Sequence, residues 1–261
     1  MAERAIPGTE LWNYCYADHL ARYMFAGDYV KGHSVLDVGT GPGYGAWMLL
    51  KAGASSVQAI DRDEDALRAA NAAYGCPGLT FAVDDAQTLA RSLNPVDVIC
   101  SFENIEHLPR PRDFLASAAR TLKPSGVLLC STPDRSATPP FGNGKPANEF
   151  HEMEWYRDEF YDMLTPFFED VELRVQIRSL QLVCRQDATR ALKEHLAYLW
   201  ASPSVRLARW VGNFRGRGVV WPDIEGLASP SMADYPIVLQ DQVALLGTSF
   251  CHFAICRNPR K

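Results

Sequence analysis

The segment Ser34–Leu50, SVLDVGTGPGYGAWMLL, decides the fold of this 261-residue chain. Its first residues, Ser34–Asp37, predict the start of a buried strand, Gly39–Gly43 predicts a tight loop, and the apolar residues after Tyr44 predict a helix. This succession lets the backbone approach a ligand closely, because a Cβ at the glycines would collide with the ligand or forbid the turn. We therefore expect a ligand site at this loop.

Two acidic residues accompany the loop. Asp37 precedes the first glycine by two positions, where a carboxylate suits a ligand with an ammonium or sulfonium better than a pyrophosphate. Asp61 ends the next apolar run about 20 residues later, where nucleotide-binding folds hold a ribose diol. An alternative is that Asp61 only caps the following helix. The glycine spacing is G-x-G-x-G rather than the dinucleotide spacing G-x-G-x-x-G, although Gly45 blurs the count.

Strand-like and helical segments alternate after the loop. Strands are expected at residues 57–60, 79–83, 96–101 and 127–132, and helices at 65–74 and 114–122, with a further helix at 11–29 before the first strand. This alternation predicts an α/β fold with a doubly wound, Rossmann-like, mostly parallel sheet of seven strands, in which the last strand returns antiparallel. Ligands of such sheets bind at the carboxyl ends of the strands.

The chain divides into four expected parts. Residues 1–30 form an arm and a helix, which either packs on the sheet or acts as a lid, and residues 31–185 form the core. Residues 186–246 break the alternation and predict a partly helical insertion that serves the substrate or a dimer interface. Residues 247–261 supply the final strand.

Composition narrows the class of protein. The formal net charge of −5 disfavours nucleic acid as a partner, because phosphate binding needs a basic face. The seven cysteines include no C-x-x-C pair and predict buried free thiols in a reducing compartment. No window of the sequence approaches a membrane span and the first residues contain no apolar signal core, so we expect a cytoplasmic protein without membrane contact.

Several motifs follow one another between Ile6 and Gln181. They are IPGT, HLARY, VLDVGTGPGYG, AIDRDEDAL, DDAQTL, DVICSFENIEHLPRPRDFL, RTLKPSGVLLCSTPD and NEFHEMEWYRDEF. With these motifs the sequence resembles the class I S-adenosylmethionine-dependent methyltransferases. Within that superfamily it is similar to the small-molecule group, which includes methyltransferases of bacterial glycan and antibiotic-sugar pathways.

The resemblance implies a set of residues around S-adenosylmethionine. It places Asp37 and the backbone of Gly39, Thr40, Gly41 and Gly43 at the methionine end of the cofactor, Asp61 at the ribose hydroxyls and Arg62 beside the adenine. It places Asp85 and Ala86 at the adenine amino edge, Phe102 and Glu103 beneath the sulfonium, and His19 and Arg22 near the cofactor carboxylate.

Catalysis requires few side chains of its own. Methyl transfer is an in-line displacement that depends mainly on positioning, but a protonated acceptor must also lose a proton to a base. His107 and His151 are the candidate bases; alternatively, His107 orients its loop and His151 bonds the backbone. Three acids expected on the substrate side, Asp134, Glu149 and Glu152, favour a cationic acceptor such as an amino sugar. Alternatively they hold a divalent metal with a sugar diol or form a solvated loop, and no residue is assigned as a metal ligand.

The sequence thus predicts a methyltransferase that converts S-adenosylmethionine to S-adenosylhomocysteine and methylates an oxygen or nitrogen atom of a small molecule. A sugar or glycosylated natural product is the expected acceptor, and a homodimer is an open option. One alternative is a catalytically silent protein that binds the cofactor as a scaffold or sensor. Another is an NAD-dependent oxidoreductase, against which Asp37 and the IEHL turn both count.

Overall fold

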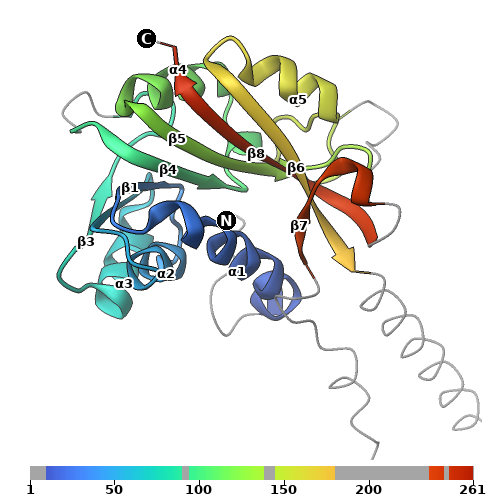
Figure 1. Ribbon diagram of the computed structural model, residues 1–261. Coiled ribbons are helices and arrows are strands. Elements are labelled where there is room, and N and C mark those ends of the chain that lie inside the picture. Colours follow the sequence, from blue (N-terminus) through green and yellow to red (C-terminus); the bar gives the residue numbers. More distant parts are fainter. Residues whose placement is uncertain (1–9, 90–93, 138–144, 180–234, 244–246, 261) are drawn as a thin grey trace, which may run out of the picture.

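The computed structural model of the protein describes residues 10–89, 94–137, 145–179, 235–243 and 247–260. In this part of the chain eight strands form one sheet, in the order β3-β2-β1-β4-β5-β8-β6-β7 (Figure 1). The strands are β1 (Ser34–Val38), β2 (Ser56–Asp61), β3 (Leu79–Val83), β4 (Val96–Phe102), β5 (Leu122–Pro133), β6 (Phe168–Ser179), β7 (Ile237–Val238) and β8 (Gly247–Pro259). The helices are α1 (Glu10–Val30), α2 (Tyr44–Lys51), α3 (Glu64–Tyr74), α4 (Pro111–Thr121) and α5 (Arg157–Leu164), with the short 3₁₀ helices η1 (Ile105–His107) and η3 (Gln240–Gln242).

The sheet is parallel from β3 to β5, whereas β8, β6 and β7 pair antiparallel. The predicted α/β, doubly wound, Rossmann-like sheet with an antiparallel final strand is therefore confirmed. The expected count of seven strands is wrong, because the two-residue strand β7 adds an eighth by pairing with β6 at Gln176 and Ile237. The chain thus returns to the sheet within the stretch 186–246 that was expected to be an insertion.

Helices cover both faces of the sheet. Figure 1 shows α4 and α5 above the sheet and α1, α2 and α3 below it. Phe114 of α4 and Phe160 of α5 belong to the hydrophobic core on one face, while Tyr23 of α1 and Leu49 of α2 belong to the core on the other. Of the two options for the first helix, packing on the sheet is therefore the one observed for residues 17–30.

Helices α1 and α2 approach each other closely at Gly45. A Cβ at this position would overlap the ring of Tyr23. The Tyr23 ring also packs edge-on against Tyr44 and Phe102, with ring centroids 5.9 Å and 5.0 Å away. Because Phe102 ends β4, this contact places α1 beside the carboxyl edge of the sheet.

The boundary of one strand differs clearly from expectation. β5 begins at Leu122, directly after α4, rather than at Val127. The reason is an irregular register between β4 and β5. Val96 already pairs with Leu122, whereas Val98 pairs with Val127, so the residues between Leu122 and Val127 are counted as part of β5. Of the partly helical insertion expected at 186–246, residues 186–234 and 244–246 lie outside the described residues.

Other expectations concern the cysteines and the membrane. Cys100, Cys130, Cys251 and Cys256 are buried free thiols, as expected, whereas Cys76 is a free thiol that is only half-buried. Among the described residues, the helices are all too short or too polar to cross a bilayer.

Candidate active site

A cavity of about 360 Å³ lies at the carboxyl edge of the parallel strands. The chain runs from β1 to β2 and β3 on one side and then passes to β4 and β5 on the other, so the winding direction changes between β1 and β4. Ligands of open α/β sheets bind at such a switch point. The cavity is lined by Val38, Gly39, Gly41, Ile60, Asp61, Arg62, Asp84, Ala86, Glu103, Asn104, His107, Leu108, Phe150 and Glu152.

The glycine loop is held by the end of β2. The backbone N–H groups of Gly39 and Thr40 both donate to the Ile60 carbonyl, at 2.9 Å and 3.0 Å. Gly39, Gly41 and Gly43 have positive φ angles of 74°, 51° and 83°, in a backbone region that residues other than glycine rarely adopt. Gly39 and Gly41 line the cavity, so this part of the loop presents its backbone to the cavity.

Asp61 lies in the cavity wall and is tied to the same loop. Its Oδ2 accepts the Gly41 N–H at 3.0 Å, and its Oδ1 accepts the Asp63 N–H at 3.0 Å. The helix cap belongs to Asp63 instead, whose Oδ1 accepts the N–H groups of Asp65 and Ala66. The alternative in which Asp61 caps α3 is therefore wrong, and its carboxylate lies in the cavity wall.

Asp37 is buried and is not part of the cavity wall. The Tyr23 hydroxyl donates to its Oδ1 at 3.3 Å. Burial raises the pKa of Asp37 to about 7, although the hydrogen bond from Tyr23 opposes the rise. Its carboxyl group thus lies among core groups at the end of β1 and outside the cavity wall, whereas the resemblance implies a place beside the cofactor.

The acid that follows β3 is displaced by one residue from expectation. Asp84 and Ala86 line the cavity, whereas the Asp85 carboxylate accepts the Gln87 N–H at 2.9 Å within its own turn. The sequence contains both acids side by side after the strand. Asp84, which directly follows the strand end at Val83, is the one in the cavity wall.

The end of β4 contributes Glu103 and Asn104. Glu103 lines the cavity, and its Oε1 accepts the Ser131 hydroxyl at 2.9 Å. Although burial opposes the effect, the charge of Arg22 holds the pKa of Glu103 below its usual value. Phe102, which was expected at the cofactor, packs in the core against Tyr23 and lies outside the cavity wall.

The two polar residues expected from α1 lie behind this wall. Arg22 is buried, donates from Nε to Gln176 Oε1 at 2.7 Å and has Nη2 3.7 Å from Glu103 Oε2. His19 has its Nδ1 3.1 Å from the Tyr44 hydroxyl, and burial together with the charge of Arg22 lowers its pKa to about 4. Neither residue is part of the cavity wall.

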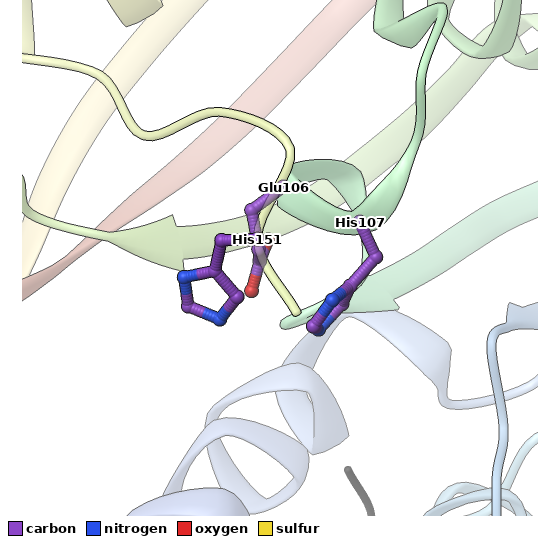
Figure 2. A group of neighbouring side chains, drawn as sticks. All are labelled: Glu106, His107 and His151. Carbon is purple, nitrogen blue, oxygen red and sulfur yellow. The ribbon is translucent and has the colours of Figure 1, made fainter. Parts of the chain in front are cut away.

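The two histidines predicted as bases are brought together from separate segments (Figure 2). Their ring centroids are 4.9 Å apart. His107, in η1, lines the cavity and has Nδ1 2.9 Å from the Phe150 carbonyl oxygen. His151 precedes α5 and has Nδ1 2.6 Å from Glu154 Oε1 and Nε2 3.0 Å from Asn148 Nδ2. The backbone joins the two segments, since the Glu152 N–H donates to the Glu106 carbonyl at 2.8 Å.

Of the three acids expected on the substrate side, Glu152 alone lines the cavity. Glu149 is exposed elsewhere. Asp134 is buried: its Oδ1 accepts the Ser136 N–H at 2.8 Å and its Oδ2 accepts the Ser249 hydroxyl at 2.7 Å. It therefore ties the end of β5 to β8, and its substrate role is corrected to a structural one.

Several wall residues escaped the analysis of the sequence. They are Val38, Ile60, Asp84, Asn104, Leu108 and Phe150. Asn104 lies against the first glycine of the loop: a Cβ at Gly39 would lie 2.7 Å from its Oδ1, so this glycine leaves room for it, and the sequence does not reveal the contact. Of the apolar members, Val38 and Ile60 lie at the ends of β1 and β2 and resemble ordinary core residues in the sequence.

Known proteins are similar to this chain in sequence and in fold. Residues 35–126 match the family model described as "Methyltransferase domain". A "Probable S-adenosylmethionine-dependent methyltransferase" of Mycobacterium tuberculosis is 35% identical over 162 residues, which are 62% of this chain and 58% of that protein. A "Ubiquinone biosynthesis O-methyltransferase" of Caulobacter vibrioides is 33% identical over 109 residues, 41% of this chain and 43% of that protein. The chain thus spans less than two thirds of these relatives.

The fold also has a solved counterpart. A phosphoethanolamine N-methyltransferase of Haemonchus contortus, solved with S-adenosylhomocysteine, superimposes with a TM-score of 0.58 at 17% identity. The match covers 98% of this chain and 54% of that one. At this identity the likeness concerns the fold alone. Residues 35–126 of this chain thus match a methyltransferase-domain family, and the chain is similar in sequence to S-adenosylmethionine-dependent methyltransferases.

Proposed function

We propose that this protein transfers the methyl group of S-adenosylmethionine to an oxygen or nitrogen atom of a small molecule, a sugar or a glycosylated natural product. The observation that carries the proposal is the composition of a single cavity. One part of its wall is the glycine loop with Asp61, and another part is His107 with Phe150 and Glu152. A cofactor in the first part would direct its reactive methyl group toward an acceptor in the second.

The cofactor half is arranged before the ligand arrives. Two backbone N–H groups hold the Asp61 carboxylate at 3.0 Å each, so it need not reorient to accept hydrogen bonds from a ribose diol. Asp84 and Ala86 lie further along the same wall, where an adenine ring would follow the ribose. Fixed positioning of this kind is the main contribution an enzyme makes to an in-line displacement.

The acceptor half carries a histidine with a defined tautomer. A carbonyl oxygen can only accept a hydrogen bond, so Nδ1 of His107 carries the proton that points to Phe150, and Nε2 keeps its lone pair. That lone pair serves either as a proton acceptor or as a ligand to a cation. Of the three acids predicted on the substrate side only Glu152 lies in the wall, so the case for a cationic amino sugar rests on this residue.

The relatives leave the acceptor atom open. One relative is named for O-methylation in ubiquinone biosynthesis, and a protein of the same fold is named for N-methylation of phosphoethanolamine. The more similar sequence is the O-methyltransferase, which favours oxygen. A silent cofactor-binding scaffold is the second candidate, since the cofactor half of the cavity would serve it equally well.

The test separates these functions by ligand and product. Calorimetric titration of the full chain with S-adenosylhomocysteine, and separately with NADH, identifies the cofactor class. Formation of S-adenosylhomocysteine is then measured with a panel of sugars, amino sugars and glycosylated small molecules. We expect binding of S-adenosylhomocysteine alone and turnover with a hydroxylated sugar. Tight cofactor binding without turnover on any acceptor would favour the scaffold, and a folded protein that binds only NADH would overturn the proposal.

A further inference from the structure

We infer that Glu106, His107 and His151 form a binding site for a divalent cation at the acceptor end of the cavity. One potential ligand atom of each side chain lies within 4.8 Å of the other two. Figure 2 shows the Glu106 carboxylate between the two imidazole rings, with two residues from η1 and one from the segment before α5. Small side-chain movements would bring nitrogen and oxygen atoms at this separation onto one ion at ordinary ligand distances of about 2.0–2.2 Å.

Each histidine is anchored through Nδ1. His107 donates to the Phe150 carbonyl at 2.9 Å, and Nδ1 of His151 lies 2.6 Å from Glu154, whose side chain is also buried. Histidines that bind metals nearly always donate their second ring N–H to a carbonyl or a carboxylate, which fixes the ring and the tautomer. The same arrangement at both residues turns both Nε2 atoms into potential ligands.

Glu106 provides independent support. The side chain is only 1% exposed, and no hydrogen bond of ordinary geometry reaches either carboxylate oxygen from the described residues. Burial and the charge of Glu103 both raise the pKa of the Glu106 carboxyl group, and the nearby Thr132 hydroxyl opposes this rise. Buried carboxylates without partners are rare because they are costly, and a bound cation would compensate for this one.

The donor set indicates the class of ion. Two imidazoles and one carboxylate suit a first-row divalent ion such as Mn²⁺, Fe²⁺, Co²⁺ or Zn²⁺, whereas Mg²⁺ and Ca²⁺ prefer oxygen ligands. Three protein ligands leave coordination positions open for a substrate. His107 is also part of the cavity wall, so these open positions adjoin the space assigned to the acceptor.

One rearrangement accompanies binding. In the present structure His151 Nε2 accepts a hydrogen bond from Asn148 Nδ2 at 3.0 Å, while Asn148 Oδ1 accepts the Phe150 N–H at 3.0 Å. An ion at Nε2 requires the Asn148 amide to turn away. Asn148→Ala removes this competing donor and provides a variant in which the ion is bound at least as tightly as in the wild type.

The consequence for the reaction rests on the proposed function. A cation lowers the pKa of a bound hydroxyl group, so an acceptor hydroxyl would release its proton to water. The acceptor oxygen then forms a bond to the cofactor methyl carbon while the carbon–sulfur bond breaks. Its electron pair stays on sulfur, which becomes the neutral thioether of S-adenosylhomocysteine. The acceptor class is therefore an alcohol or diol, and His107 acts as a ligand rather than as the base.

The site is tested by Mn²⁺ binding to the full, tag-free chain, followed by electron paramagnetic resonance and calorimetry. We expect one Mn²⁺ per chain, binding weakened at least about tenfold in His107→Gln, His151→Gln and Glu106→Gln, and about tenfold in Glu154→Gln. His33→Gln, which changes an exposed histidine outside the cluster, is the matched control. Circular dichroism shows whether each variant is folded. If Glu106→Gln does not fold, the Mn²⁺ affinities of the two histidine variants decide whether the cation site exists.

Two results would overturn the inference: a folded wild type that binds no Mn²⁺ at millimolar concentration, or Mn²⁺ binding that is unchanged in both histidine variants. Titration of the same samples with S-adenosylhomocysteine keeps this outcome separate from the proposed function. Cofactor binding without Mn²⁺ binding would remove the cation site alone. Mn²⁺ binding at the three residues without cofactor binding would support the site and remove the methyltransferase function.

Discussion

The Gly41 N–H donates to the Asp61 carboxylate at 3.0 Å, so the loop after β1 and the acid at the end of β2 fix each other. The contact spans two parallel strands that are neighbours in the sheet. It positions the carboxylate while leaving it in the cavity wall. One hydrogen bond therefore links the glycine loop to the acid that we propose as the ribose ligand.

Replacing Asp61 is expected to remove cofactor affinity with little loss of stability. Asp61→Asn keeps the size of the side chain but loses a charged acceptor, and hydrogen bonds to charged groups contribute about 1.5–3 kcal/mol. We expect calorimetry to show S-adenosylhomocysteine binding weakened by roughly 10- to 100-fold. Asp63→Ala is the matched control: it removes the α3 cap and costs about 1 kcal/mol of stability. Equal loss of affinity in both variants would contradict the assignment.

Two glycines in helices should respond in opposite ways to the same change. Gly45→Ala forces a methyl group into the Tyr23 ring, and overpacking of this kind costs about 1–3 kcal/mol. Gly27→Ala meets only the Ala52 side chain at 3.4 Å, an ordinary contact, and removes backbone freedom from the unfolded state. We expect a gain of about 0.5–1 kcal/mol for Gly27→Ala. Urea unfolding of both variants checks the expectation, and a stable Gly45→Ala would show that α1 is not seated as described.

The buried Asp37 predicts a dependence of stability on pH. Its pKa is about 7 in the folded state and 3.8 in the reference state, so the folded protein binds the extra proton between these values. Stability contributed by this group therefore falls as the pH rises from about 4 to about 7, by up to on the order of 4 kcal/mol. The groups that face it are Tyr23, Thr40 and Asp61.

Asp37→Asn removes this titration. The free energy of unfolding of the variant, relative to wild type, should increase steadily when both are measured by urea unfolding at several pH values between 4 and 7.5. A difference that stays constant across this range would mean that Asp37 titrates normally in the folded protein.

The cysteines should differ in reactivity with iodoacetamide. Burial raises the pKa of the Cys100, Cys130, Cys251 and Cys256 thiols, and only the thiolate reacts. Cys76 is half-buried, so it should react on the order of 100-fold faster than these four, which can react only after local unfolding exposes them. Peptide mass spectrometry at timed intervals measures each site, and all five should react alike in denaturant. Comparable native rates would contradict the described core.

Most of the fold could be predicted because its signals are local. The bounds of β3 are those expected, and α3 begins within one residue of the predicted start because apolar periodicity and caps mark it. β7 could not be predicted, since two residues carry no periodicity and gain strand geometry only by pairing with β6. The start of β5 was missed for a related reason: its register with β4 is set by the neighbour and not by its own sequence.

The candidate site divides in the same way. Asp61 and the glycine loop were predictable because sequence spacing places them at adjacent strand ends. Arg22 and Asp134 were assigned to ligands, but their partners, Gln176 and Ser249, lie more than a hundred residues away in the sequence. A buried charged side chain whose hydrogen-bond partner lies far along the chain looks, in sequence, the same as one that meets a ligand.

The pairing of β6 with β7 has an evolutionary consequence. Ile177 N–H donates to the Pro236 carbonyl at 3.1 Å, so the chain leaves the sheet after Ser179 and re-enters it at almost the same point. The entropic cost of closing such a loop grows only slowly with its length. A change in the length of the chain that joins β6 to β7 can therefore leave the strand order and the position of Asp61 unaltered. Selection can thus vary the length of this connection while the glycine loop after β1 keeps its place in the fold.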